Sequence, residues 1–346
     1  MLSIMVKSNR KLEVEQSSAP AVDADSVIVK VHVSGLCGSD LPRIFHYGAH
    51  FYPIVLGHEF AGEVVDVGER VTEVKVGDRV ACAPLVPCGE CDHCQNDLYS
   101  LCQDYSFIGS RQAGGNAELV KLPQQCCFVL DEEVSLIEGA FFEPLTVSLH
   151  PILMAGGVAG KEVIVVGVGT IGLLAIQAAK ALGASSVTAI DINQQKLDKA
   201  VSLGADAGFN ASEKDLAQTI SRYTDQTKSQ LILETAGSPA SVRQCLNIAA
   251  PRASIALIGT LHQDLTLSYQ EFGQILRKEI NLFGSWMNYS APYPGEEWQI
   301  AKQLFANNQI DTESLLDGVY PPQAFVERVT ALDGTSPEGK ILLKWS

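Results

Sequence analysis

The sequence predicts an α/β protein in which a β-rich, partly open barrel is followed by a doubly wound parallel sheet. Between Leu12 and Leu122, short β-branched runs such as VIVKVHVSG and VGDRVACAP are separated by glycine and proline, which is typical of a small barrel. From Val163 onward, apolar strand-like runs alternate with helix-like segments, the pattern of a parallel sheet covered by helices. A chain of 346 residues is long enough for two such domains.

The second region begins with a strand, a tight turn and a helix in direct succession. The stretch VIVVGVGTIGLLAIQAAKALGA places Gly167, Gly169 and Gly172 in a G-x-G-x-x-G pattern after a β-branched run. Glycines in this pattern allow the backbone to approach a pyrophosphate closely, at the positive end of the following helix. We therefore expect a Rossmann nucleotide site that also includes Thr170 and Ile171, which lie between the second and third glycines.

An acidic residue ends the next predicted strand. Asp191 follows the run SVTAI, and its carboxylate is placed to accept hydrogen bonds from the adenosine ribose hydroxyls and to repel a 2′-phosphate. The next residues, Ile192 and Asn193, supply no positive charge. The sequence therefore favours NAD over NADP. FAD uses the same glycine pattern, but that pattern then usually lies near the N-terminus.

Four cysteines are concentrated in the short stretch CGECDHCQNDLYSLC. Cys88, Cys91, Cys94 and Cys102 have the spacing C-x2-C-x2-C-x7-C, which can surround one tetrahedral ion with four thiolates. Because all four positions would be filled by protein, such a zinc site would be structural. An iron–sulfur cluster is the main alternative, but no proline follows the fourth cysteine and the last spacing is not x3.

Composition excludes several classes of protein. Nine cysteines in a chain without a visible secretory signal indicate reduced thiols and a cytoplasmic location. The net charge of -15 repels polyanions, so nucleic acid is not an expected partner. The most apolar window, Val163 to Ala179, contains three glycines and is shorter than a membrane span, so no membrane association is expected.

Three separate segments of the β-rich region each carry one potential zinc ligand beside glycine or proline. These segments are GLCGSD, LGHEF and FFEPLTV, and the ligands are Cys37, His58 and Glu143. Three protein ligands leave a fourth position open, and a thiolate with a carboxylate balances the charge of Zn²⁺. An alcohol in the open position could lose its proton near neutral pH.

Over essentially its whole length the chain resembles the zinc-dependent medium-chain alcohol and polyol dehydrogenases. GLCGSD, LGHEF, the four-cysteine segment, EPLTV and GVGTIG occur in the order and spacing of that family. The resemblance implies a GroES-like catalytic domain and a Rossmann domain. It also implies two Zn²⁺ per chain: a catalytic ion at Cys37, His58 and Glu143, which the adjacent Glu59 can approach, and a structural ion at the four cysteines.

The same resemblance assigns further roles around the catalytic ion. Ser39 matches the hydroxyl that takes the alcohol proton, and Asp40 would orient His58 through the second ring nitrogen. One position departs from the family pattern: many relatives have a proton-carrying histidine where this chain has Pro42. The sequence therefore leaves two alternative proton paths beyond Ser39, one through water and one through the cofactor ribose.

The family resemblance also implies boundaries and assembly. We expect the GroES-like domain over residues 1–147, the Rossmann domain over 148–284, and a C-terminal segment, 285–346, that returns to the catalytic domain. Dimers and tetramers are common among the relatives, so a homodimer or homotetramer is expected.

The expected reaction is the NAD-dependent oxidation of a secondary alcohol on a sugar-alcohol phosphate. The stretches LCGSDLPRIF, GTLHQDL and GSWMNYS resemble polyol-phosphate dehydrogenases within the family. Arg43 and His50 are candidate donors to the phosphate, and Asn288 is a candidate for binding polyol hydroxyls. Arg43 could instead pair with a surface acid.

Three other functions remain as alternatives. A dehydrogenase of free polyols such as sorbitol would need no phosphate site. A cofactor-free zinc scaffold would not explain Asp191 behind a glycine turn, and a zinc-independent quinone reductase should lack Cys37, His58 and the four-cysteine segment together.

Overall fold

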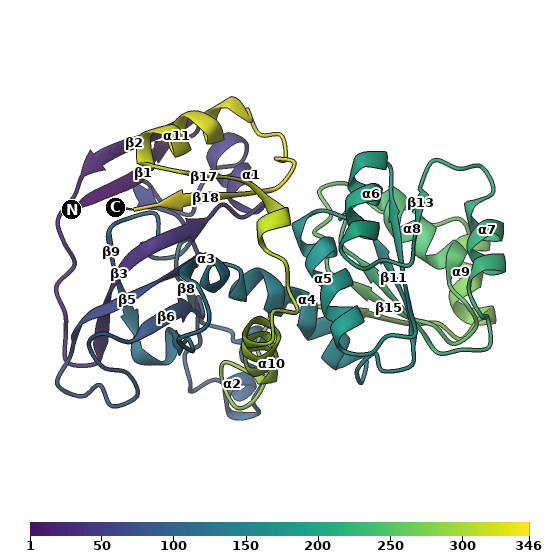
Figure 1. Cartoon of the computed structure of the whole chain (residues 1–346), viewed down its shortest axis with the longest axis horizontal. Coiled ribbons are helices and arrows are strands. Elements are labelled where there is room, and N and C mark those ends of the chain that lie inside the picture. The colour runs from purple at the N-terminus through teal and green to yellow at the C-terminus, as the bar shows by residue number, and fades with distance from the viewer. Residues whose placement is uncertain (346) are drawn as a thin grey trace. The chain divides into compact units, whose positions relative to one another are not determined.

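The computed structural model describes residues 1–345, and its internal contacts divide the chain into two compact units (Figure 1). The first unit comprises Met1–Pro144, Tyr289–Asn307 and the described chain from Thr312 onward. The second unit comprises Leu145–Asn288 and Asn308–Asp311. The sequence predicted domain boundaries after residues 147 and 284. The division into units does not test these boundaries, which remain predictions.

The first unit is built on a seven-stranded sheet with the order β10-β6-β5-β3-β18-β17, in which β9 also pairs with β3. Its strands are β3 (Ser26–Gly35), β5 (Glu59–Val67), β6 (Arg79–Cys82), β9 (Leu119–Pro123), β10 (Cys127–Val129), β17 (Leu316–Tyr320) and β18 (Lys340–Lys344). A three-stranded sheet contains β2 (Lys11–Gln16), β1 (Leu2–Ser8) and β4 (Ile54–Val55), and a two-stranded one contains β7 (Leu85–Val86) and β8 (Ser106–Phe107).

Strand β3 organises the core of this unit. Its β-branched run buries Val27, Val29 and Val31 in one cluster with Phe60 of β5. Branched side chains of this kind pack well on a pleated surface. The helices are α1 (Asp40–Phe45), α2 (Asp92–Gln95), α3 (Leu136–Gly139), α10 (Glu296–Ala306) and α11 (Pro322–Ala331), with 3₁₀ turns at Tyr99–Leu101, Gln124–Cys126 and Glu313–Leu315. The predicted β-rich barrel is confirmed.

The second unit contains a six-stranded, wholly parallel sheet with the order β13-β12-β11-β14-β15-β16. The chain runs outward from β11 in one direction and then in the other, which is the predicted doubly wound arrangement. The strands are β11 (Glu162–Val166), β12 (Ser186–Asp191), β13 (Ala207–Asn210), β14 (Gln230–Glu234), β15 (Ser254–Leu257) and β16 (Asn281–Gly284).

Helices connect these strands, as parallel pairing requires. They are α5 (Thr170–Ala181), α6 (Gln194–Ser202), α7 (Leu216–Tyr223), α8 (Pro239–Ile248) and α9 (Tyr269–Arg277), while α4 spans Phe142–Met154. Isoleucines of four neighbouring strands meet in one buried cluster with helix residues. Within residues 1–345, no helix is both long enough and apolar enough to cross a membrane.

Candidate active site

The ends of three neighbouring strands bring the candidate metal ligands together. Strand β3 pairs antiparallel with both β5 and β18, so its carboxyl end meets the amino ends of those strands. Cys37 follows the end of β3, Glu59 is the first residue of β5 with His58 just before it, and Lys340 is the first residue of β18. The sheet order therefore assembles residues that are far apart in the sequence.

Cys37, His58 and Glu59 form the tightest group. One ligand atom from each lies within 4.8 Å of the other two. Glu143, in the first turn of α4, is also buried and acts electrostatically on Cys37. The preceding Phe142 anchors this turn by stacking on Phe305, with 4.9 Å between ring centroids.

The electrostatics of this group favour the presence of a cation. Burial raises the pKa of the Cys37 thiol and of the Asp40 carboxyl, and it raises the pKa of Glu143 to about 7. The negative charge of Glu59 adds to the effect of burial in all three cases. Buried anions this close are unfavourable unless a cation compensates them. Thiolate, imidazole and carboxylate are the donors that zinc prefers, so the residues fit the metal.

Lys340 supplies one positive charge inside the group. Its Nζ donates to Glu59 Oε2 at 2.6 Å and to the Leu36 carbonyl at 3.3 Å, and both ionic side chains are buried. Burial lowers the pKa of Lys340, but the charges of Glu59 and Cys37 outweigh this and raise it. Gly35 provides the space, because a Cβ there would lie 2.5 Å from Glu59 Oε2. Lys340 therefore balances the charge of Glu59.

The expected hydrogen bond from His58 to Asp40 is not formed. His58 Nδ1 lies 3.8 Å from Asp40 Oδ1, which exceeds hydrogen-bonding distance, and both atoms are buried without a hydrogen-bond partner. The Asp40 carboxylate instead accepts a long bond of 3.4 Å from the Cys37 N–H. The imidazole of His58 packs edge-on against Phe107, with 5.5 Å between ring centroids. Asp40 thus acts on His58 by charge.

Ser39 is exposed beside the group and is held by two contacts. Its hydroxyl donates to Cys37 Sγ at 3.3 Å. It accepts from Arg43 Nη1 at 2.9 Å, and the same nitrogen donates to the Ser39 carbonyl at 2.7 Å. Arg43 also lies 3.6 Å from Asp40. Arg43 follows Pro42, which stands where many relatives have a histidine. Arg43 fixes the hydroxyl that is expected to take the alcohol proton.

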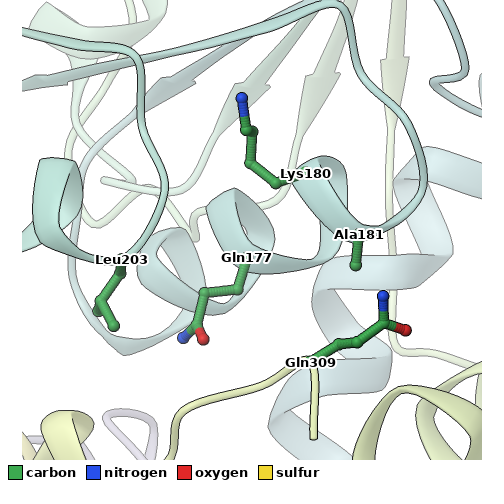
Figure 2. A pocket seen from close by; sticks show the side chains of 5 residues that line it. All are labelled: Gln177, Lys180, Ala181, Leu203 and Gln309. Carbon is green, nitrogen blue, oxygen red and sulfur yellow. The ribbon is translucent and has the colours of Figure 1, made fainter. Parts of the chain in front are cut away.

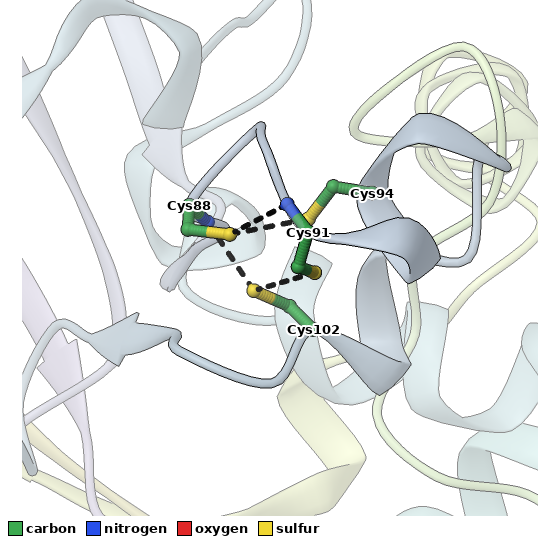
Figure 3. Close-up of side chains that lie close together, drawn as sticks. All are labelled: Cys88, Cys91, Cys94 and Cys102. Atoms are coloured by element: carbon green, nitrogen blue, oxygen red, sulfur yellow. Dashed lines mark hydrogen bonds between the residues drawn. The ribbon is translucent and has the colours of Figure 1, made fainter.

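The four cysteines of the 88–102 segment are turned toward one another (Figure 3). Cys88 Sγ lies 3.9 Å from Cys94 Sγ, and Cys91 Sγ lies 4.0 Å from Cys102 Sγ. Zinc–sulfur bonds of about 2.3 Å require sulfur pairs about 3.8 Å apart in a tetrahedron. Main-chain N–H groups, first that of Gln103, lower the pKa of Cys91 to about 6. The segment therefore fits a zinc ion.

Tyrosines attach this cysteine segment to the rest of the unit. Tyr99 packs edge-on against Tyr293, and Ser100 Oγ donates to the Tyr289 carbonyl at 3.3 Å. The hydroxyl of Tyr289 accepts from the Leu85 N–H at 3.0 Å. Tyr289 is thus part of the framework.

Nearby, Asn288 is buried and its amide donates to Thr146 Oγ1, whereas Trp286 is 55% exposed. The remaining cysteines are buried: Cys82, Cys126, Cys127 and Cys245.

In the second unit, the glycine turn leaves space where a nucleotide would lie. Gly167 has φ +91°, and a Cβ there would lie 2.7 Å from Ala236. A Cβ on Gly172 would lie 2.0 Å from the Gly167 carbonyl, so both positions require glycine. A Cβ on Gly169 would meet nothing within 4 Å, and no side chain caps α5, which begins at Thr170. The amino end of α5 is therefore open to a pyrophosphate.

Asp191 connects this turn to the end of β12. Its Oδ2 accepts from the Val168 N–H at 2.8 Å, and its Oδ1 accepts from the Asn193 N–H at 2.9 Å. A carboxylate has further lone pairs, so these bonds leave capacity for ribose hydroxyls. The bonds also fix the carboxylate beside the turn.

A shallow pocket of about 320 Å³ lies along α5 (Figure 2). Two of its polar side chains are already engaged: Gln177 bonds to the main chain of Asp311, and Lys180 pairs with Asp206. Leu203, Ala181 and Gln309 complete the lining. This pocket offers no reactive group.

Sequence reasoning missed two features of the first unit. Lys340 lies near the C-terminus, 281 residues from its partner Glu59, and no local motif marks it. Phe107 follows the four-cysteine segment in SFIGSRQAGG, where the glycines were an available signal. A Cβ on Gly109 would lie 2.3 Å from the Gly57 carbonyl, so this loop packs directly against the residue before His58.

Comparison with known proteins identifies similar chains over the full length. Residues 23–132 match the alcohol dehydrogenase GroES-like domain, and residues 170–307 match the zinc-binding dehydrogenase model. Galactitol 1-phosphate 5-dehydrogenase of Escherichia coli strain K12 is 47% identical over 344 residues, which is 99% of each chain. Sorbitol dehydrogenase of Bacillus subtilis strain 168 is 31% identical over 326 residues, 92% of this chain and 90% of the relative.

The fold is similar as well. The crystal structure of galactitol-1-phosphate dehydrogenase from Escherichia coli superposes with a TM-score of 0.96 at 46% identity, covering 100% of both chains. These similarities confirm the expected GroES-like and Rossmann folds and the resemblance to polyol-phosphate dehydrogenases.

The two ligand sets should have separable functions. We expect Cys37→Ser to abolish turnover and remove one zinc ion while the protein stays folded. Cys91→Ser should remove the other ion and mainly lower stability, because it releases the cysteine segment. Metal analysis combined with thermal unfolding checks both variants. A fully active chain containing a single zinc ion would contradict this assignment.

Removing Lys340 should leave the Glu59 charge buried and uncompensated. Lys340→Met is expected to lower the free energy of unfolding by about 3 to 5 kcal/mol, the usual cost of breaking a buried pair. The double variant Lys340→Met with Glu59→Met should recover much of this loss. Urea unfolding of the zinc-loaded proteins measures both effects. Equal stability of the wild type and the single variant would contradict the role of the pair.

Proposed function

Because the chain belongs to the zinc-binding dehydrogenase family, we propose that it oxidises galactitol 1-phosphate at carbon 5 with NAD, giving a ketose phosphate of the tagatose 6-phosphate type. The observation that carries this proposal is the convergence of Cys37, His58, Glu59 and Glu143 beside the Ser39 hydroxyl. A relative of that specificity is 47% identical over 99% of both chains, which favours a polyol phosphate over a free polyol.

The side chains support a division of tasks. Cys37, His58 and a carboxylate, Glu143 or Glu59, would hold zinc, which would supply a Lewis acid that lowers the pKa of the substrate alcohol. Ser39 would accept the alcohol proton, and NAD, when bound, would supply the hydride acceptor.

Neighbouring residues hold these groups in place. Arg43 fixes the Ser39 hydroxyl through its bond to Oγ, so that a lone pair of the hydroxyl oxygen is available to the alcohol. Lys340 holds Glu59 by an ion pair, which limits the negative charge of the ligand group. The proton path beyond Ser39 leads to solvent or to the cofactor ribose, because Pro42 cannot carry a proton.

The cofactor is held at the glycine turn of the second unit. We infer that Gly167, Gly169 and Gly172 accommodate the pyrophosphate at the start of α5, with the Thr170 and Ile171 N–H groups as donors. Asp191 accepts from the ribose hydroxyls and disfavours NADP. The four cysteines would hold a second zinc ion, which would be structural.

Other properties of the chain support a cytoplasmic homo-oligomer. Nine free cysteines are consistent with a reducing compartment. Helix α9 exposes Tyr269, Phe272 and Leu276 on one face, and β16 is an edge strand with an exposed Leu282. Exposed apolar side chains on a helix face and on an edge strand are each typical of a protein–protein contact, which supports a homodimer or homotetramer.

Asp191→Ala tests the cofactor assignment. The variant should bind NAD more weakly and should show a smaller preference for NAD over NADP, because both hydrogen bonds and the repulsion of a 2′-phosphate are lost. Dissociation constants for the two cofactors measure this change. A wild-type protein that prefers NADP would contradict the role of Asp191.

The proposed substrate is tested by following NAD reduction with galactitol 1-phosphate, galactitol, sorbitol 6-phosphate and sorbitol. We expect the highest kcat/KM for galactitol 1-phosphate and a marked loss when the phosphate is absent. A protein that oxidises sorbitol as efficiently as any phosphate would instead be a dehydrogenase of free polyols, the second candidate.

A further inference from the structure

A loop outside the predicted ligand set contacts the candidate metal site and carries an arginine. The loop of residues 105–112 contacts this site twice, through Phe107 against His58 and through Gly109 against the Gly57 carbonyl. Arg111 lies two residues beyond Gly109, and its N–H donates to the Phe107 carbonyl at 2.9 Å. The main chain of Arg111 is therefore bonded to the residue whose ring packs against the His58 imidazole.

The Arg111 side chain is held by an aromatic ring. Its guanidinium lies 4.4 Å from the centroid of Tyr105, and its Nη2 lies 3.3 Å from the Tyr105 hydroxyl oxygen. Within residues 1–345, no carboxylate pairs with Arg111. The other arginines of the first unit are bound to carboxylates or to main-chain carbonyl groups: Arg10, Arg43, Arg70, Arg79 and Arg328. Arg111 is thus oriented and retains free donors in a chain of net charge -15.

The positive charges of Arg111 and Arg43 both act on a third side chain, His50. His50 follows α1, and its pKa is lowered first by burial and then by the positive charges of Arg111 and Arg43. In the described chain, no carboxylate is among the charges that act on His50. Arg43 uses one nitrogen to hold Ser39, and a guanidinium has further N–H donors. The two arginines would stabilise a bound anion, and the anion would in turn favour the protonated form of His50.

We propose that Arg111, together with His50 and Arg43, binds the phosphate of the polyol phosphate, and that Arg111 is the main determinant of the preference for a phosphorylated substrate. This inference rests on the proposed function. In galactitol 1-phosphate, the phosphate and carbon 5 lie toward opposite ends of the polyol. Ser39 lies where carbon 5 would react. Arg43 contacts Ser39 and also belongs to the group that would receive the phosphate. A guanidinium fixed by stacking suits a phosphate dianion, because its fork can donate two parallel hydrogen bonds.

The test compares Arg111→Ala and Arg111→Lys with the wild type, using galactitol 1-phosphate and free galactitol at saturating NAD. Arg111→Ala should reduce kcat/KM for the phosphate by about ten- to hundredfold, the loss expected for one charge-assisted hydrogen bond. The loss for galactitol should be much smaller, so the ratio of the two kcat/KM values falls. Arg111→Lys should lie between the wild type and the alanine variant, because it keeps the charge without the fork.

Arg70→Ala is the matched control. It removes the same charge from the same unit, but Arg70 pairs with Asp25, which precedes β3, whereas Cys37 follows the other end of that strand. This control should keep the wild-type ratio. Zinc content and melting temperature confirm that each variant is folded, and Arg111→Lys retains the cation–π contact if the alanine variant is unstable.

Inorganic phosphate separates the inference from the proposed function. With galactitol 1-phosphate as the varied substrate, inorganic phosphate should inhibit the wild type competitively, because both occupy the phosphate site, and it should inhibit Arg111→Ala at least about tenfold more weakly. If the wild type prefers galactitol 1-phosphate and Arg111→Ala keeps that preference, the proposed function stands and the inference is wrong. If the wild type shows no preference, the proposed substrate is wrong. The inorganic phosphate result then decides the inference: equal inhibition of the wild type and the variant overturns it.

Discussion

The burial of several acidic groups at one end of β3 is the constraint on which the catalytic unit depends. Cys37, Asp40 and Glu143 have raised pKa values because each is buried and each is affected by the charge of Glu59. Such a group is unfavourable without compensating cations, and Lys340 supplies one. Arg43, which lies 3.6 Å from Asp40, supplies a second, so the four acidic groups keep two negative charges, which match a divalent ion. The same charges that make the unliganded site costly therefore give it affinity for a metal.

The sheet explains why these residues meet. Antiparallel pairing of β3 with β5 and β18 places the end of one strand against the starts of the other two. Gly35 removes the side chain that would collide with Glu59. The loop after the cysteine segment then packs Phe107 against the imidazole of His58. The cysteine segment that precedes this loop is itself held at Tyr293 and Tyr289, through Tyr99 and Ser100. The cysteine segment and the residues around His58 are thus connected.

Features encoded by short, contiguous patterns could be predicted from the sequence. The glycine turn, β11, α5 and Asp191 follow from local periodicity and glycine spacing, and the four cysteines meet because their spacings are short. Features that depend on long-range pairing could not be predicted. Lys340 lies on the last strand and reaches Glu59 only because β18 joins β3, whereas a lysine near a C-terminus would ordinarily be assigned to the surface. The predicted hydrogen bond between Asp40 and His58 is absent for a related reason. The distance of 3.8 Å between Asp40 Oδ1 and His58 Nδ1 depends on details of packing that no motif encodes.

The central claim is that the buried acidic group at the end of β3 holds a metal ion that is distinct from the one at the four cysteines. X-ray absorption at the zinc edge of the fully loaded wild type, compared with Cys37→Ser, tests it most directly. The wild type should show a mixture of sulfur with nitrogen or oxygen ligands. The variant should show sulfur ligands alone, with half the zinc. A wild-type spectrum containing only sulfur ligands would contradict the claim.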